Sequence, residues 1–216
     1  MERERHVAYS KHVKGPNWPN IRLEDGDTPL LSAVRHELGD PRPGSNGGVL
    51  VLLKSGADPN ITNISGQFPL LLASSRLKVA VAEELLRHNA NPNQAHDPSG
   101  LSPIHVAASN GNVRLLNLLI SYNVNLHAKD DFGRTAMRFA AAKGSSGSCL
   151  FLYLLSHFSF SVCLYVEFVE VLLQRGAVVT WSDVSAARDN GFASLANRMN
   201  MYVCLPPSSI KRVLPR

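Results

Sequence analysis

The sequence has too few of the residues that would identify several common kinds of site. Only three of its 216 residues are cysteines. They lie at positions 149, 163 and 204, too few for a disulfide framework and at spacings that match no zinc motif. The eight histidines do not fall at metal-ligand spacing. There is no Gly-x-x-x-x-Gly-Lys-Ser/Thr phosphate loop and no Gly-x-Ser-x-Gly nucleophile turn. We therefore expect no catalytic residues, no bound metal and no cofactor.

An excess of one charge is also missing from most of the chain. The net charge is +5 and the pI is about 9.3, which raises the question of a nucleic-acid or membrane partner. The excess lies at the two ends, +2 in residues 1–14 and +3 in residues 205–216, while residues 15–204 carry 15 basic and 15 acidic groups. Without a basic stripe, the sequence does not predict nucleic-acid binding. The first residues lack the apolar run of a signal peptide, so a cytoplasmic or nuclear protein is expected.

Two short sequence phrases recur along the chain. The first joins a glycine to a small residue, often Pro, and an apolar residue, with the glycines spaced by 40, 34 and 33 residues. It occurs at Gly26–Leu30, Gly66–Leu70, Gly100–His105 and Gly133–Met137. The second starts with Leu-Leu and leads to Gly or Asn, and it occurs at Leu52–Asn60, Leu85–Asn93, Leu118–Asn125 and Leu172–Ala177. Repetition at this period is typical of solenoid proteins.

The two phrases also carry the signals of helix ends. Pro suits a first helical turn, and Thr28, Ser102 and Thr135 stand where an N-cap oxygen is needed. Each Leu-Leu pair is followed by a residue that tolerates a left-handed backbone, namely Gly56, Asn89, Asn123 and Gly176. Each unit therefore reads as two short helices, and alanines in the first helix predict close packing between neighbouring units.

The phrases resemble the ankyrin-repeat pattern Gly-x-Thr-Pro-Leu-His followed by Leu-Leu-x-x-Gly-Ala-x-x-Asn. This resemblance implies an all-α solenoid of helix-turn-helix pairs with β-hairpin fingers. It covers residues 20–180 as four repeats, 21–60, 61–93, 94–127 and 128–180. We expect residues 1–19 to be the remnant of a preceding repeat or a flexible N-terminus, 181–200 a degenerate capping helix pair, and 201–216 a basic tail.

The fourth repeat is interrupted by an apolar insertion near residues 145–166. The stretch 149–166 is long enough for a membrane span of about 18 residues, but it lacks flanking cationic or Trp anchors. A second interpretation is a helical hairpin or lengthened helix packed on the solenoid. A third, which we favour as a hypothesis, is a product of alternative splicing, because excising the insertion restores a repeat of ordinary length. A membrane association is not expected.

With no catalytic constellation, the resemblance implies a non-enzymatic scaffold or adaptor that binds a protein partner, and we expect a monomer. The concave face and the finger tips would make the contacts. By register, the candidate contact residues are Ile64, Ser65, Gln67, Asp97, Ser99, Leu101, Ser109, Asn110, Asp131, Phe132, Arg134 and Arg138. Leu101 and Phe132 would be exposed anchors, since large side chains dominate interface energies.

Three further expectations follow from the same resemblance. His105 would bond to backbone between repeats rather than take part in catalysis. Asn60 resembles the asparagine that a 2-oxoglutarate-dependent hydroxylase modifies in ankyrin repeats. The segment Leu205–Lys211 resembles the end of a SOCS box. An alternative function is therefore that of a substrate-recognition adaptor of a cullin-type ubiquitin ligase, although the segment is too short for a whole box.

Overall fold

The computed structural model describes residues 18–24, 26–36, 47–143 and 160–203. The helices in these ranges are the 3-10 helix η1 (Trp18–Asn20) and the α-helices α2 (Pro29–His36), α3 (Gly47–Lys54), α4 (Pro69–Ser75), α5 (Val79–Arg87), α6 (Pro103–Ser109), α7 (Val113–Ser121), α8 (Ala136–Lys143), α10 (Phe160–Gln174), α11 (Trp181–Asp189) and α12 (Ala193–Val203). Most of the segment 149–166 lies outside the described residues.

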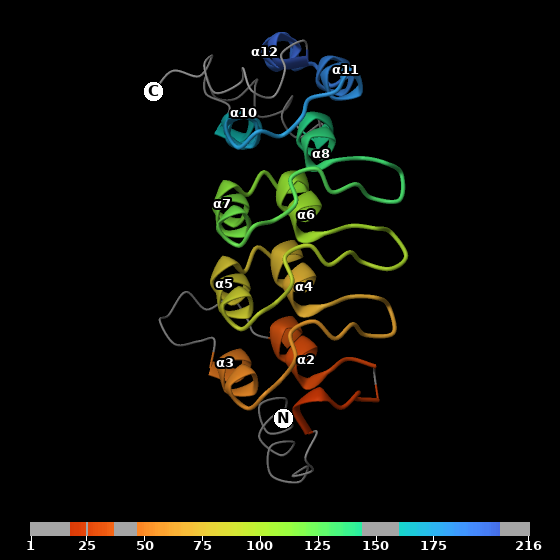
Figure 1. The fold of residues 1–216 in the computed structure, drawn as a ribbon, viewed down its shortest axis with the longest axis vertical. Coiled ribbons are helices and arrows are strands. Elements are labelled where there is room, and N and C mark those ends of the chain that lie inside the picture. The colour runs from red at the N-terminus through yellow and green to blue at the C-terminus, as the bar shows by residue number, and fades with distance from the viewer. Residues whose placement is uncertain (1–17, 25, 37–46, 144–159, 204–216) are drawn as a thin grey trace.

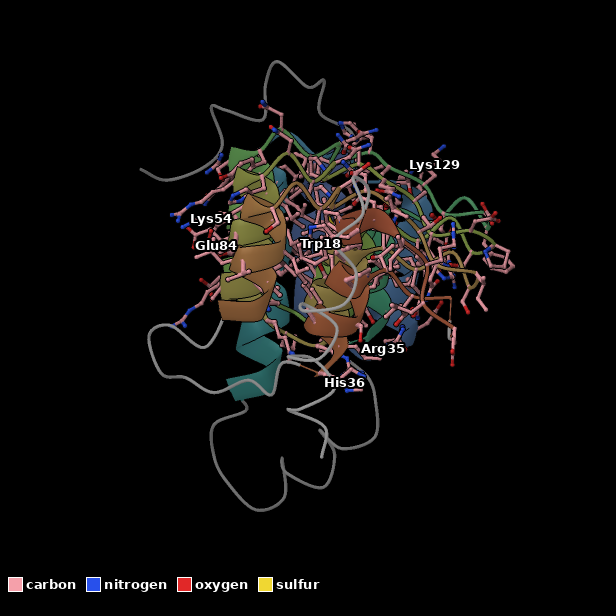
Figure 2. All side chains as sticks on the ribbon, turned by 90° about the horizontal axis from the view of Figure 1, so that it is seen from below. Trp18, Arg35, His36, Lys54, Glu84 and Lys129 are labelled. Carbon is pink, nitrogen blue, oxygen red and sulfur yellow. The ribbon has the colours of Figure 1, made fainter. Side chains whose placement is uncertain are left out.

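The helices stack in two parallel rows (Figure 1). An inner row contains α2, α4, α6, α8 and α11, and an outer row contains α3, α5, α7, α10 and α12. The segments that lead into α2, α4, α6 and α8 project to one side as fingers (Figure 1). Figure 2, seen along the stack, places Lys129 on the finger side and Lys54 and Glu84 on the opposite side, with the outer row. The predicted all-α solenoid is confirmed.

Local sequence explains where most of these helices begin and end. The Thr28 hydroxyl accepts a hydrogen bond from the Leu31 N–H (3.2 Å), and Ser102 forms a capping box with His105. The four residues predicted to end helices all have positive φ: Gly56 (90°), Asn89 (65°), Asn123 (58°) and Gly176 (85°). Those four predictions are confirmed.

Thr135 is an exception among the predicted N-caps. Its Oγ1 atom is buried and has no hydrogen-bond partner, so the prediction that it caps α8 is wrong. The Thr135 carbonyl accepts a hydrogen bond from the Phe139 N–H (3.1 Å). Thr135 therefore contributes to the first turn of α8 through its backbone and not through its hydroxyl.

A single apolar core runs through the whole stack. Alanines of the inner row, including Ala73, Ala107 and Ala140, have no exposed surface, which lets neighbouring inner helices approach closely. Leucines of the outer row fill the space between the rows, as Leu85, Leu116 and Leu172 do, also with no exposed surface. Ala33, predicted for the same role, is only partly buried. Each helix pair packs on the next, so the apolar core is continuous along the stack and is not concentrated at one point.

The C-terminal part departs from the sequence prediction in two places. Helix α10 begins at Phe160, so residues 160–166 of the insertion continue into the helix that the repeat pattern places at Glu167–Gln174. Helix α12 ends at Val203, three residues into the segment predicted to be tail. Among the described helices, none has both the length and the apolar character needed to cross a membrane.

Candidate functional site

Four fingers form the side of the molecule opposite the outer row. They are finger 1 (residues 23–27), finger 2 (63–67), finger 3 (96–101) and finger 4 (130–134). Each is closed by a backbone hydrogen bond, from Leu23 N–H to Asp27 O (2.8 Å) in finger 1 and from Asn63 N–H to Gln67 O (2.8 Å) in finger 2. Finger 3 is closed between His96 N–H and Leu101 O (2.7 Å) and has one more residue in its turn.

Side chains within the fingers fix the shape of their tips. Asn63 Oδ1 in finger 2 accepts the N–H groups of Ser65 (3.0 Å) and Gln67 (2.9 Å). Asp130 Oδ1 in finger 4 accepts the corresponding N–H groups of Phe132 (3.0 Å) and Arg134 (2.8 Å). An Asx side chain that satisfies two turn donors rigidifies the turn. The residues at the tips are therefore presented in a fixed geometry.

Neighbouring fingers touch at their glycines. A Cβ atom built on Gly66 would lie 1.9 Å from the carbonyl oxygen of Asp97, and one on Gly100 would lie 2.5 Å from Asp131 Oδ1. Gly26 is approached in the same way by the Ile64 side chain (2.9 Å). All three glycines also have positive φ, between 65° and 78°. Glycine is thus required here both by the backbone and by the next finger.

A buried polar network joins fingers 1 and 2 to the inner row. The Asp27 carboxylate is 3% exposed and accepts hydrogen bonds from Arg35 of α2, Nε to Oδ2 at 2.9 Å and Nη2 to Oδ1 at 3.2 Å. Asn63 Nδ2 donates to the same carboxylate (2.7 Å), and Arg35 Nη2 also donates to Gln67 Oε1 (3.2 Å). Because the network spans two repeats, it sets the position of finger 2 relative to finger 1.

Finger 4 carries a stack of rings around a guanidinium group. Arg134 Cζ lies 4.8 Å from the ring centroid of Phe132 and 4.7 Å from that of Phe139 in α8. The guanidinium also pairs with Asp130 Oδ2 at 2.7 Å. Burial raises the pKa of Asp130, but the hydrogen bonds from Arg134 outweigh burial and hold that pKa below its usual value of 3.8. Phe132 itself is 78% exposed.

The structure separates the predicted contact residues into three groups. Exposed ones are Ile64, Ser65, Asp97, Asn110, Asp131 and Phe132. Half-buried ones are Gln67, Ser99, Leu101, Ser109 and Arg138. Arg134 is exposed but already bound within finger 4.

One of these predictions needs correction. Leu101 is not an exposed tip residue, because it pairs with His96 at the base of finger 3 in an isolated antiparallel bridge. Arg138 stays a candidate contact residue, and its Nη1 donates to the carbonyl of Ser182 in α11 at 3.2 Å.

Sequence reasoning missed several residues of this surface. Phe139 was passed over because the pattern marks it only as a position of the first helix, although its ring lies between Arg134 and His105, 5.4 Å from the His105 ring. Trp181 was passed over because it replaces the proline of the repeat phrase, yet it is 62% exposed. An aromatic residue where the pattern has a small one was the available signal.

His105 has the structural role that its position predicted. Its Nδ1 accepts the Ser102 N–H (3.1 Å), so the proton of the neutral ring is on Nε2, which donates to the Ala128 carbonyl of the next repeat (3.0 Å). The residue has no exposed surface. Burial lowers the pKa of His105 below its usual value of 6.5, and the bond to Ala128 opposes that shift. The expected bond between repeats is confirmed.

This lowered pKa predicts a pH dependence of stability. The unfolded chain takes up a proton at His105 at a higher pH than the folded chain does, so the free energy of unfolding falls as pH falls below 6.5. Chemical denaturation from about pH 7.5 to about pH 4.5 would measure the loss. His105→Gln should flatten this part of the curve, whereas His127→Gln, at an exposed loop position, should leave it. An unchanged curve in His105→Gln would contradict the assignment. The loss from Asp130 comes separately, below pH 3.8.

Asparagines between the outer and inner rows form a ladder across the repeats. Three asparagine side chains each make two hydrogen bonds to the loop of the next repeat. They are Asn20, Asn60 and Asn93. Asn60 Nδ2 donates to Asn89 O (3.1 Å), and its Oδ1 accepts the Asn91 N–H (2.7 Å). Asn20 bonds Gly56 O and Asp58 N–H in the same way, and Asn93 bonds Asn123 O and Asn125 N–H. The side chain of Asn60, the residue predicted for hydroxylation, thus forms hydrogen bonds between repeats.

The ladder predicts that Asn60→Ala costs more stability than Asn91→Ala. The first change removes two hydrogen bonds between repeats, about 1–2 kcal/mol in all. Asn91 accepts from the Asn93 N–H two residues on (2.9 Å), a bond within one loop, so its loss should cost about 0.5 kcal/mol. Urea denaturation followed by circular dichroism measures both. Equal losses would show that the inter-repeat bonds contribute nothing beyond the local turn.

Comparison with known proteins places this architecture in a family. The sequence model described as "Ankyrin repeats (3 copies)" matches residues 42–130 and 70–183, which together cover more than half of the chain. The chain belongs to the ankyrin-repeat family. Ankyrin repeats are protein-interaction modules, and the family is in general non-enzymatic. Among the described residues of this chain, no three His, Cys, Asp or Glu side chains lie together as a group that could hold a metal ion.

Individual ankyrin-repeat proteins match parts of the chain. The putative ankyrin repeat protein FPV024 of fowlpox virus is 33% identical over 87 residues, 40% of this chain and 15% of that protein. The bovine ankyrin repeat and SOCS box protein 3 is 36% identical over 93 residues, 43% of this chain and 18% of the relative. Human ankyrin repeat domain-containing protein 63 is 33% identical over 136 residues, 61% of this chain and 34% of the relative. In each case the match spans about a third or less of the relative's length.

Proposed function

We propose that this ankyrin-repeat chain is a non-enzymatic scaffold or adaptor that binds a protein partner through its finger tips and the concave face of the inner row. The observation that carries the proposal is the exposure of Ile64 (77%) and Phe132 (78%) on turns whose backbone is already fixed by Asn63 and Asp130. Ile64 packs on Gly26 of finger 1, but most of its surface, like that of Phe132, is not used by the fold. Both side chains are suited to bury their surface in a partner.

A matched set of variants tests the proposal. The partner would be identified by crosslinking the full chain in extracts and then purified, and its affinity measured by calorimetry. Ile64→Ser with Phe132→Ser should weaken binding by at least about tenfold, since loss of an anchor costs about 1–2 kcal/mol or more. Val51→Ser is the control, because Val51 is also apolar and exposed (61%) but lies on α3 in the outer row.

Two outcomes would contradict the proposal. Equal weakening by Val51→Ser would show that exposed apolar surface in general, and not the finger side, is responsible. Full affinity in the double finger variant would place the partner elsewhere. Circular dichroism of each variant confirms that the fold is kept. We propose a cytoplasmic or nuclear location for the same interaction, which imaging of the tagged chain would check.

The alternative function, an adaptor of a cullin-type ubiquitin ligase, has one supporting comparison, the similarity to ankyrin and SOCS box protein 3. The SOCS-like segment Leu205–Lys211 lies outside the described residues. Co-purification of elongin and cullin subunits with the full chain would support this function. Their absence from a complex that still contains the finger-dependent partner would leave the scaffold function alone.

A further inference from the structure

The row of fingers stops one repeat before the row of helices does. Residues 122–135 separate α7 from α8 and include finger 4, whereas only residues 175–180 separate α10 from α11. Figure 1 shows fingers projecting to one side beside α2, α4, α6 and α8, and none beside α11. The position that a fifth finger would take, next to finger 4, is therefore vacant among the described residues.

The first turn of α11 occupies only the base of this position. In the preceding pair, His105 Nε2 bonds the carbonyl of Ala128 at the base of finger 4 (3.0 Å). At the same register in α8, Arg138 bonds the carbonyl of Ser182 in α11 (3.2 Å). Trp181, the residue before Ser182, begins α11 and is 62% exposed. An exposed indole thus stands beside the base of the missing finger.

The glycines of the fingers show how finger 4 differs from the others at its tip. Gly26, Gly66 and Gly100 each lie against the next finger, so that an added Cβ would be within 3 Å of it. Gly133 of finger 4 has the same left-handed backbone (φ 72°), yet none of the described residues has an atom within 4 Å of an added Cβ. The tip of finger 4 therefore presents the same surface as the other tips without the segment that covers them.

The groups around the vacancy indicate what fits there. The Asp131 side chain lies over Gly100, back toward finger 3, and Arg134 is paired with Asp130. The side chains that remain at the edge, Phe132 and Trp181, are apolar. One of the three finger junctions is a model for an apolar occupant, since the aliphatic side chain of Ile64 on the turn of finger 2 covers Gly26, whereas the Asp97 backbone covers Gly66 and Asp131 covers Gly100.

We propose that the vacant position bordered by Phe132, Gly133 and Trp181 binds a tight turn of a protein partner whose tip carries an aliphatic side chain. The turn extends the row of fingers by one member. Each finger already packs on the one before it, so the docked turn continues an existing interface rather than forming a new kind. This position is a second contact area, in addition to the finger tips. The inference rests on the proposed function in one respect, that the occupant is a protein.

A peptide copied from finger 2 tests the proposal directly. The probe is a backbone-cyclised peptide with the sequence of residues 61–68, which contains the Asn63-capped turn and the aliphatic tip Ile64. It is titrated into the full-length chain, and amide and indole chemical shifts are followed by NMR. We expect saturating shift changes at Asp131, Gly133 and the Trp181 indole. A peptide with Ser in place of the aliphatic tip should bind at least about tenfold more weakly.

Variants of the chain distinguish the vacant position from other surfaces. Gly133→Asn places a side chain in the vacancy at a backbone conformation that Asn tolerates, as Asn89 and Asn123 do here. This substitution should weaken binding of the peptide by at least about tenfold, and Trp181→Ala should weaken it by a similar factor. Gly56→Asn is the matched control, because Gly56 also has positive φ (90°) and open space around its Cβ position but lies at the end of α3.

Several results would overturn the proposal. The first is the absence of saturating shift changes at the three reporter sites. The second is shift changes confined to the helices of the inner row. The third is an equal weakening of peptide binding by Gly56→Asn. Self-association of the full chain that Gly133→Asn abolishes would also overturn it, because the occupant would then be a second copy. Peptide binding is measured without the partner of the finger side, so its failure is separable from failure of the proposed function.

Discussion

Gly66→Ala should lower the free energy of unfolding by about 3–4 kcal/mol, far more than the same change in finger 4. The positive φ of Gly66 (72°) costs an alanine about 1–2 kcal/mol. The added methyl group would also lie 1.9 Å from the Asp97 carbonyl, which is backbone and can give way only if finger 3 moves. Overpacking of this kind costs a further ~1–3 kcal/mol and weakens the junction between repeats 2 and 3.

Gly133→Ala is the control that isolates the contact between fingers. Gly133 has the same φ of 72°, but none of the described residues has an atom within 4 Å of its Cβ position, so only the conformational cost of about 1–2 kcal/mol remains. Denaturant unfolding of both variants measures the difference. If the two lose the same stability, the fingers do not pack on each other in solution as closely as the structure shows.

Asp27→Ala should cost about 3 kcal/mol, the second large effect. Removing this buried carboxylate leaves Arg35 without its bidentate partner and leaves the donor of Asn63, which is only 7% exposed, without an acceptor. Breaking a buried pair by removing one member costs about 3–5 kcal/mol, and the 32% exposure of the Arg35 side chain places the value at the lower end. Because Asn63 also caps finger 2, the tip carrying Ile64 should become more mobile.

Glu83→Ala removes a carboxylate from an exposed pair and serves as the comparison. Glu83 pairs with Arg87 at 2.6 Å, but their side chains are 42% and 55% exposed. Such pairs contribute about 0–1 kcal/mol, and Arg87 keeps its bond to Glu84. Thermal and urea unfolding should therefore show almost no change. A loss comparable to that of Asp27→Ala would contradict the view that burial and the link between repeats make the first network strong.

Most of the fold could be predicted because its signals are local. The glycines and asparagines that end helices, such as Gly56 and Asn89, act through their own backbone angles. The N-caps Thr28 and Ser102 act over three residues. Thr135 failed as a cap although its position fits the signal, because a short-range pattern does not set the rotamer that leaves its Oγ1 buried and without a partner. The residues inserted before Phe160 interrupt the period and could not be placed by it.

The candidate site was predicted less completely. Register correctly marked which positions lie in the fingers, but exposure depends on the neighbouring repeat. Leu101 and Arg134 belong to the same register position as Asp27 and Gln67, and all four differ in their contacts. Whether these surfaces bind a partner stays a prediction until the variants above are measured.

The sequence by itself determined the repeat, the helix pairs and the left-handed helix ends, because each depends on residue type at a fixed spacing. Its resemblance to ankyrin repeats implied the bond that His105 makes between repeats. Only the tertiary structure decided how the fingers pack, that Arg134 is held between Phe132 and Phe139, and that finger 4 is the last finger of the described residues. The packing of the fingers depends on contacts between residues far apart in sequence, such as Gly66 and Asp97, whereas the Arg134 contacts are local and depend on side-chain rotamers that spacing does not set. The repeat pattern sets which residues face each other across neighbouring repeats, but not which of them fill the space between them.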